Sequence, residues 1–280
     1  MERLPIMGLA TKGQQTMRLL NKLMLAGHQI FTKPSTPVLE NVGNCPTCES
    51  EVTFVAREAW LRDHYFCSKC GSIPRERALM LTIDTYFPDW RNLIIHESSP
   101  GNRGASKRLA QQCNHYIPSQ FFPNNDPGSI VGGTRCENLE ALSFNDESVD
   151  LHITQDVLEH VFHPSKVFSE IARTLKPGGA HIFTVPIVNK YRPSKLRARC
   201  DNGEITHLVS PVFHGNPISD EGSLVTVDWG FDICHHIFKS SGLFTQLIYI
   251  DDISKGIRAE YIEVFITFKL SDSGRGNAIP

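Results

Sequence analysis

The chain has 280 residues, of which 40% are hydrophobic and 21% are charged. This length allows one sizeable core with a small accessory module, and it excludes two full α/β domains. The formal net charge of −2 gives no general attraction to nucleic acid or to an anionic membrane.

No apolar stretch is long enough to span a bilayer, and the first residues lack the charged, apolar and small-residue pattern of a signal peptide. We therefore predict a cytoplasmic protein without a transmembrane segment. The pattern leaves the oligomeric state open.

Residues 1–40 are predicted to form a helical arm and a linker. Met17, Leu20, Leu23 and Met24 recur at a spacing that places them on one face of a helix. Such a face more often packs on its own domain than on a partner or a membrane. Residues 33–37 contain two prolines and are typical of a linker.

Four of the eight cysteines form two close pairs. Cys45 with Cys48 and Cys67 with Cys70 make two CxxC motifs separated by eighteen residues, which suits a four-cysteine zinc ribbon. The apolar residues between the motifs are too few to fold without an ion. We predict a zinc ribbon over residues 41–76 in which these four cysteines bind one Zn²⁺, while the spacing leaves a rubredoxin-like iron site open.

The predicted ribbon carries no surplus of positive charge. Residues 44–79 contain five Lys or Arg and five Asp or Glu. Because phosphate backbones are bound through a basic surface, this balance argues against nucleic acid as a partner. It favours a scaffolding role or a role in substrate specificity.

A larger domain is predicted over residues 77–270. Its first elements are a helix that ends near Pro88, a strand at 93–95, a glycine-containing turn at 96–104, a helix at 105–112 and a strand at 115–122. Residues 149–154, 164–175 and 180–185 are typical of a strand, a helix and a second strand, with a Pro-Gly-Gly stop after the helix. Two strands joined by a crossover helix lie parallel in one sheet.

This last unit carries a resemblance. The runs FNDESVDLHITQDVLEHV and FSEIARTLKPGGAHIFTVP are similar to the second half of a class I, type 11-like methyltransferase that depends on S-adenosylmethionine (SAM). The junction CSKCGSIPRERAL resembles bacterial methyltransferases that have an N-terminal zinc ribbon, many of them near surface-polysaccharide enzymes. The resemblance implies an α/β fold with a Rossmann-like seven-stranded sheet whose last strand, here residues 261–268, is antiparallel. A helix at 229–241 and a strand at 244–250 precede that last strand.

The resemblance also implies a SAM site at the ends of the first, second and fourth strands. The family's acidic-x-Gly-x-Gly-x-Gly corner corresponds to residues 97–104, where Ser99 replaces the first glycine. The second strand lacks the acidic residue that holds the ribose hydroxyls in many relatives, and it offers Gln120 instead. The cofactor-binding residues predicted in this way are Glu97, Ser99, Gly101, Gln120, Glu137, Asn138, Gln155 and Asp156.

Residues 187–228 lie between the fifth strand and the following helix and are predicted to form a substrate cap. Five of the ten residues 190–199 are basic, which suits either a phosphate on the acceptor or a solvent-exposed surface. Transfer to a hydroxyl also needs a base, and His214, His207 and Asp156 are the candidates. Glu159 and His160 are assigned to structure or to cofactor contact.

The sequence thus predicts a SAM-dependent methyltransferase that O-methylates a sugar, a glycan or another phosphate-bearing small acceptor. Two alternatives stay open: an RNA methyltransferase with a zinc module, and a methyltransferase fold that has lost catalysis and acts as a binding or scaffold protein. Residues 271–280 are polar and glycine-containing, and they are predicted to be a flexible tail.

Overall fold

The computed structural model describes residues 36–216 and 219–271. The predicted N-terminal helix and almost all of the predicted tail lie outside the described residues. From Pro37 onward the chain forms one compact unit. No helix in the described part of the chain is long and apolar enough to cross a membrane.

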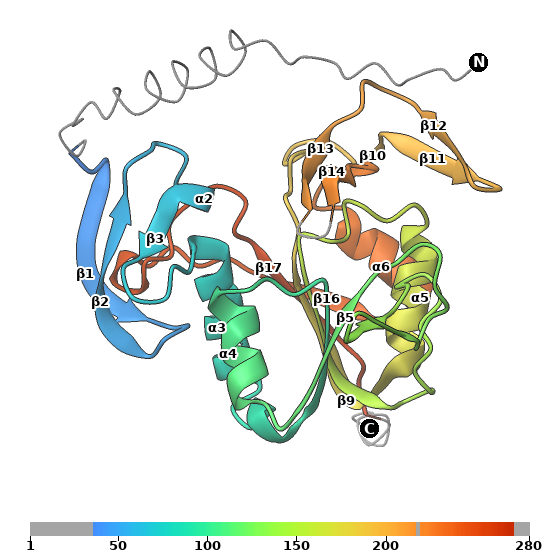
Figure 1. The fold of residues 1–280 in the computed structure, drawn as a ribbon, viewed down its shortest axis with the longest axis horizontal. Helices are drawn as coiled ribbons and strands as arrows, with labels where there is room; N and C mark the ends of the chain where they lie inside the picture. Colours follow the sequence, from blue (N-terminus) through green and yellow to red (C-terminus); the bar gives the residue numbers. More distant parts are fainter. Residues whose placement is uncertain (1–35, 217–218, 272–280) are drawn as a thin grey trace, which may run out of the picture. The chain divides into compact units, whose positions relative to one another are not determined.

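The first part of this unit is a small three-stranded antiparallel sheet (Figure 1). Its strands are β1 (Leu39–Cys45), β2 (Ser50–Ala56) and β3 (Tyr65–Cys67), with the short helix α2 (Leu61–His64) before β3. Phe54 and Tyr65 are fully buried and pack with the cysteines in a separate core. We call this part, with its four cysteines, the ribbon.

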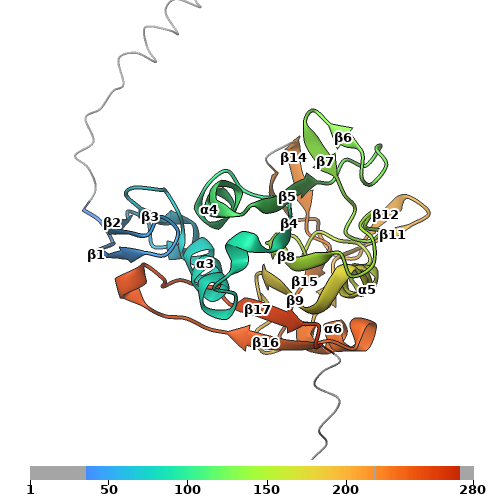
Figure 2. The ribbon, with the colours of Figure 1, turned by 90° about the horizontal axis from the view of Figure 1, so that it is seen from below.

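The main sheet has eight strands, in the order β16-β17-β9-β8-β4-β5-β7-β6 (Figure 2). The strands are β4 (Ile94–Ser98), β5 (His115–Gln120), β6 (Ile130–Val131), β7 (Thr134–Cys136), β8 (Val149–Gln155), β9 (Leu175–Thr184), β16 (Phe244–Ile248) and β17 (Val264–Phe268). The five strands from β9 to β7 are parallel, and β17 is antiparallel to both of its neighbours. The antiparallel last strand agrees with the prediction.

The predicted count of seven strands is wrong. The additional strand is β6, which pairs antiparallel with β7 at the edge of the sheet. Gly132 and Gly133 join the two strands and both have positive φ values, of 57° and 87°. Glycine adopts this conformation without strain, so the chain reverses within two residues and adds a short hairpin arm.

Four longer helices cover the sheet. They are α3 (Pro74–Tyr86), α4 (Gly104–Gln112), α5 (Pro164–Thr174) and α6 (Ile233–Ser241), with short 3₁₀ turns η1 (Trp90–Asn92) and η2 (Ile253–Lys255). One core lies between the sheet and α3 and α4, and the other between the sheet and α5 and α6 (Figure 1). Because successive strand residues face opposite sides, Ile182 belongs to the first core and Phe183 to the second.

Two predicted elements begin later than expected. Residues 229 and 230 bond to the cap rather than to a helix: Trp229 O accepts from Asn189 N, and Gly230 N donates to Ser194 Oγ at 2.9 Å. Helix α6 therefore starts at Ile233. Tyr261 has a φ of 54°, which is incompatible with a strand, so β17 starts only at Val264.

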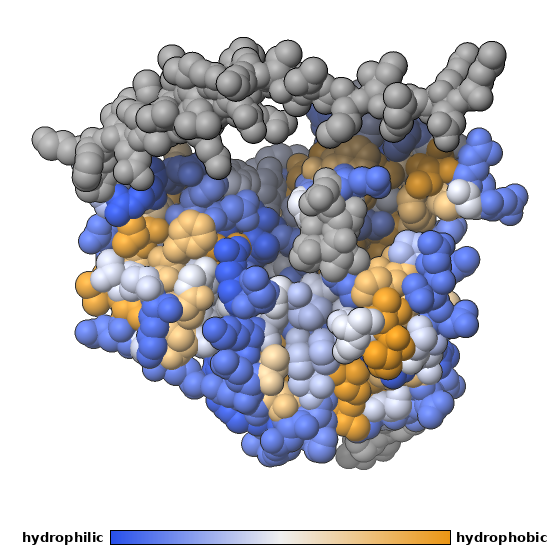
Figure 3. All heavy atoms as spheres, in the orientation of Figure 1, coloured by the Kyte–Doolittle hydropathy of each residue, from blue (hydrophilic) through white to orange (hydrophobic). Residues whose placement is uncertain are grey.

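Residues 187–228, the cap, contain three antiparallel strand pairs at the upper right of Figure 1. The pairs are β10 (Lys195–Leu196) with β15 (Val227–Asp228), β11 (Ala198–Asp201) with β12 (Glu204–His207), and β13 (Phe213–Asn216) with β14 (Ser219–Leu224). Thr226 N donates to Glu159 O at 2.7 Å and fixes the cap beside β8. Apolar side chains are exposed on the cap and on the ribbon (Figure 3), among them Ile205, Phe213 and Val42.

Candidate active site

A cavity of about 1430 Å³ lies at the carboxyl ends of β4, β5 and β8 and is also lined by the ribbon and the cap. Open parallel sheets bind ligands at this edge. Seven of the eight predicted cofactor-binding residues line the cavity, and Glu97 does not. Of the predicted bases, Asp156 and His214 line it and His207 does not.

Glu97 is fully buried and organises the first corner from within. Its carboxylate accepts hydrogen bonds from Ser106 Oγ at 2.6 Å, Tyr116 Oη at 2.7 Å and Gln155 Nε2 at 2.8 Å. Burial raises the pKa of Glu97, and these three donors act against that rise. Ser106 Oγ also accepts from Gly101 N at 3.1 Å, so Glu97 holds the turn in place through Ser106.

The turn contains a residue with a strained backbone, Ser99, and a glycine with free space around it, Gly101. Ser99, which takes the place of a glycine, has a φ of 54°, in the left-handed region that side chains disfavour. Gly101 has no such φ, and a Cβ built there would meet only Ser106 Oγ, at 3.9 Å. The backbone conformation therefore does not require a glycine here, and the missing side chain of Gly101 leaves space at the cavity wall.

Gln120 lies at the end of β5, where the ribose contact was predicted. Its side chain is buried, and Oε1 has no hydrogen-bond partner among the described residues. A buried acceptor without a partner is costly unless a ligand satisfies it. This atom therefore fits the hydroxyl group of a bound nucleoside.

The loop after β7 contains Glu137 and Asn138, two of the predicted cofactor-binding residues, and both form hydrogen bonds within the loop. The Glu137 carboxylate accepts from Arg135 Nε at 2.6 Å, Ser143 Oγ at 2.5 Å and Ser143 N at 2.9 Å. Asn138 Oδ1 accepts from Glu140 N at 2.9 Å. Both side chains shape this loop at the wall of the cavity.

Asp156 faces the ribbon side of the cavity and is already paired. Its carboxylate forms ion pairs with Arg62 Nη2 at 2.7 Å and Arg75 Nε at 3.0 Å, and it accepts from Thr184 Oγ1 at 3.1 Å. Burial would raise the pKa of Asp156, but the charges of Arg75 and Arg62 lower it to about 2. An occupied carboxylate of such low pKa is a weak base, which argues against the predicted catalytic role of Asp156.

Glu159 faces the cap side and is unpaired. It is only 2% exposed, and neither carboxylate oxygen has a hydrogen-bond partner among the described residues. Its Oε1 lies 3.8 Å from His160 Nε2 and 3.7 Å from His214 Nδ1. His207, by contrast, ends the exposed strand β12. The structure thus brings His214 together with two residues to which the sequence assigned other roles.

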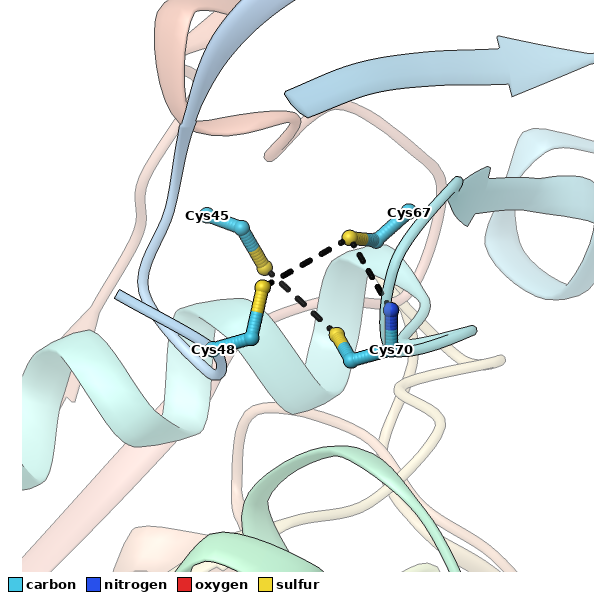
Figure 4. A group of neighbouring side chains, drawn as sticks. All are labelled: Cys45, Cys48, Cys67 and Cys70. Atoms are coloured by element: carbon cyan, nitrogen blue, oxygen red, sulfur yellow. Dashed lines mark hydrogen bonds between the residues drawn. The ribbon is translucent and has the colours of Figure 1, made fainter. Parts of the chain in front are cut away.

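The four cysteines of the ribbon converge on one point (Figure 4). The Sγ atoms of Cys45 and Cys70 lie 3.8 Å apart, and those of Cys48 and Cys67 lie 3.9 Å apart. Two thiolates of a tetrahedral zinc site, with Zn–S bonds of about 2.3 Å, lie roughly 3.8 Å from each other. All four cysteines are free of disulfides. Their number, type and spacing fit one tetrahedral metal ion.

Comparison with known proteins gives a match in the central part of the chain. Residues 102–183, from the glycine-containing turn to β9, match the family model described as a methyltransferase domain. The matched stretch is less than a third of the chain and includes β4's following turn, α4, β5, β8, α5 and β9. The match supports an enzyme that uses SAM.

Relatives of the methyltransferase domain are distant. The dimethylglycine N-methyltransferase of Parasynechococcus marenigrum is 26% identical over 148 residues, which are 49% of this chain and 53% of that protein. The chain thus spans about half the length of this relative. A SAM-dependent methyltransferase from Mesorhizobium loti (14% identity, 68% of this chain and 96% of that chain) has a TM-score of 0.44. An amino pentose methyltransferase from Micromonospora echinaspora (10% identity, 71% and 92%) has a TM-score of 0.45.

The stretch that matches the methyltransferase domain contains neither the ribbon nor the cap. Sequence reasoning named His214 of the cap but missed Arg62 of α2 and Arg75 of α3. Arg62 and Arg75 reach Asp156 from before the matched stretch. His214 reaches Glu159 from after it. The local sequence indicated Arg62 and Arg75 only through the high density of charge around Arg75, because their contacts with Asp156 join residues far apart in the chain.

Proposed function

We propose that the protein is a SAM-dependent methyltransferase whose acceptor is a hydroxyl group of a sugar, a glycan or another small phosphate-bearing molecule. The observation that carries this proposal is a single cavity with cofactor-type residues at one end and the cap at the other. Gly101 leaves room for a close contact between the cofactor and the backbone. Gln120 Oε1 is a buried acceptor without a donor among the described residues, and a ribose hydroxyl would supply one. SAM supplies an activated methyl group, and the protein aligns it with the acceptor.

Arg197 is the residue of the basic run that supports a phosphate-bearing acceptor. It lines the cavity, whereas the other four basic residues of the run do not. Asp228 and Ser210 O take up its two terminal nitrogens, at 2.7 and 2.8 Å. Its buried Nε has no partner among the described residues. An acceptor oxyanion would satisfy this donor.

His214 activates the acceptor hydroxyl. The hydroxyl proton has to leave as the methyl group arrives. Among the three predicted bases, Asp156 is held by two arginines and His207 lies outside the cavity lining. His214 lines the cavity and is half-exposed. Replacing it by Ala should lower turnover by roughly a hundredfold while SAM affinity hardly changes.

The cysteine cluster holds Zn²⁺ as a structural ion. Four thiolates close the coordination shell, so the ion contributes folding energy and leaves no position for substrate. The buried Arg77 joins the ribbon to the large domain by donating to Tyr65 O at 2.8 Å and to Gly256 O at 2.6 Å. The ion thereby maintains the ribbon that brings Arg62 to Asp156. Metal analysis of protein purified without chelator should find one zinc per chain, and neither zinc nor iron would contradict this.

Calorimetry with the demethylated product, S-adenosylhomocysteine (SAH), tests cofactor binding. Gly101→Ala adds a Cβ that meets the protein only at an ordinary contact distance, so the variant should stay folded. We expect SAH affinity to fall by roughly tenfold in Gly101→Ala and to vanish in Gly101→Leu, because the backbone approach is blocked. If the wild-type protein gives no heat with either SAM or SAH, the scaffold alternative is correct.

Labelled SAM tests the acceptor. Cell extract is separated into RNA, glycan and small-molecule fractions and incubated with the protein and methyl-labelled SAM. We expect label in the glycan or small-molecule fraction, incorporated roughly a hundredfold more slowly by His214→Ala. Label that accumulates in RNA would instead support the RNA methyltransferase alternative.

A further inference from the structure

A second group of potential metal ligands lies in the cavity, apart from the cysteines. Glu159, His160 and His214 each offer one ligand atom, and these atoms all lie within 4.8 Å of one another. The first two residues follow β8, and the third belongs to β13 of the cap. All three line the cavity.

The buried Glu159 carboxylate needs a positive partner. A carboxylate removed from water is strongly disfavoured unless it is paired or coordinates a metal. Arg62 and Arg75, the nearby arginines, are both engaged by Asp156. No described residue donates a hydrogen bond to either oxygen of Glu159. The site is therefore built around a buried carboxyl group whose two oxygens receive no hydrogen bond from the described residues.

His160 is oriented as a ligand. Its Nδ1 lies 2.8 Å from Leu224 O, and since a carbonyl only accepts, Nδ1 carries the proton. The lone pair of Nε2 is then free on the side of Glu159, 3.8 Å from Oε1. Histidines that bind metals usually donate their other N–H to a backbone carbonyl or a carboxylate in this way.

The spacing suits one ion. Glu159 Oε1 lies 3.8 Å from the nitrogen of His160 and 3.7 Å from that of His214. A cation with bonds of about 2.1 Å keeps its ligands roughly 3 to 4.2 Å apart. Only small side-chain adjustments are needed to close the three ligands on a common centre.

We propose that Glu159, His160 and His214 bind one divalent transition-metal cation whose remaining coordination positions face the acceptor. Two imidazoles and one carboxylate with open positions are a known donor set for such ions. This inference rests on the proposed function and deepens it, because it gives the form in which His214 activates the acceptor. The coordinated hydroxyl releases its proton to water. Its oxygen then forms the new bond to the methyl carbon as the carbon–sulfur bond of SAM breaks, leaving SAH.

Binding of Mn²⁺ to the full chain tests the proposal, with the cysteine zinc left in place. Mn²⁺ prefers oxygen and nitrogen ligands over thiolates, so the cysteine cluster does not interfere. Free Mn²⁺ is followed by electron paramagnetic resonance. The wild-type protein should bind one Mn²⁺, and both Glu159→Gln and His214→Ala should weaken this binding by about a hundredfold or more. His235→Ala removes an exposed histidine of α6 outside the cavity lining and should bind Mn²⁺ like the wild type.

SAH calorimetry on the same samples separates the possible failures. A wild-type protein that binds SAH but no Mn²⁺ overturns the metal site and leaves the methyltransferase proposal standing. Equal Mn²⁺ binding by the wild type and Glu159→Gln also overturns the metal site. If the wild type binds Mn²⁺ but not SAH, the proposed function fails instead. Normal SAH affinity in both variants shows that they are folded.

Discussion

Asp156 and Glu159 lie three residues apart after β8, but they face two sides of the cavity that treat a buried carboxylate in opposite ways. On the ribbon side, Asp156 has two arginines and a threonine as partners. On the cap side, Glu159 is more deeply buried and has no hydrogen-bond partner among the described residues. On the ribbon side the carboxylate of Asp156 is fully paired. On the cap side the carboxyl group of Glu159 still needs a cation or a proton.

The interior of the sheet supports this distinction. His96 and His152 are buried against Phe144 on one face of the sheet, and their Nδ1 atoms lie 2.9 Å apart. The other ring nitrogen of His96 contacts Ser119 Oγ at 2.7 Å, and that of His152 contacts Thr174 Oγ1 at 2.8 Å. Buried polar groups that are fully paired serve the structure. The unpaired carboxylate of Glu159 is therefore the one to expect at a ligand site.

The largest effect on turnover is expected from Glu159→Gln, which keeps the shape of the side chain and replaces the carboxyl group by an amide. Turnover should fall by roughly a hundredfold, equivalent to about 2.7 kcal/mol of lost transition-state stabilisation. The melting temperature should hardly change, because the wild-type carboxylate has no protein partner to lose. A fall in melting temperature together with a loss of SAH binding would make Glu159 a structural residue like Asp156.

Asp156→Asn should act in the opposite way, on stability. It removes one of the two carboxylates that the buried Arg62 and its neighbour Arg75 share, the other being the more exposed Asp63, at a cost of about 2–4 kcal/mol. Urea unfolding measures this loss. Adding Arg62→Met should recover part of it, because the residual charge is then removed as well. If the losses in free energy of unfolding caused by the two substitutions are additive, the ion pair between Arg62 and Asp156 does not stabilise the protein.

Acid should weaken the sheet interior before it affects the ribbon side. Burial lowers the pKa of His96 and brings that of His152 to about 3. The unfolded chain takes up these protons near its usual histidine pKa of about 6.5. Stability is thus complete above about pH 6.5 and is lost as the pH falls toward the folded value, by about 2 kcal/mol for His152 at pH 5. The pKa of Asp156 is also lowered, but from an ordinary value of 3.8, so its contribution is lost only below that pH.

Urea unfolding at pH 7.5 and pH 5 tests whether the free energy of unfolding falls as the pH is lowered. The charged and titratable groups around the pair are His181 of β9 and Arg135 of β7. His152→Gln should reduce the loss at pH 5. His115→Gln, which replaces an exposed histidine of β5, should leave the loss unchanged. Equal stability of the wild type at the two pH values would contradict the prediction.

The parts that could be predicted from the sequence are those set by neighbours in the chain. The unit β8-α5-β9 follows from apolar spacing and a Pro-Gly-Gly stop, and the two CxxC motifs bring their own sulfurs close together. The contact of Arg62 with Asp156 joins residues 94 positions apart, and no local pattern indicates it. The lack of hydrogen-bond partners at Glu159 among the described residues is still harder to predict, because it requires that none of the surrounding elements places a donor beside the carboxylate.

The smallest effect is expected at Ser99, a residue of the cavity lining whose backbone conformation is strained. Glycine relieves the left-handed conformation of this residue but gives the unfolded chain more freedom, so Ser99→Gly should stabilise by at most about 1 kcal/mol. Ser98, in the extended backbone of β4, is the matched control, and Ser98→Gly should destabilise by about 0.5–1 kcal/mol. Urea unfolding of the two variants compares them directly. Equal destabilisation would mean that Ser99 carries no strain. Opposite signs would place a strained backbone at the cofactor end of the same cavity whose cap end holds an unpaired carboxylate.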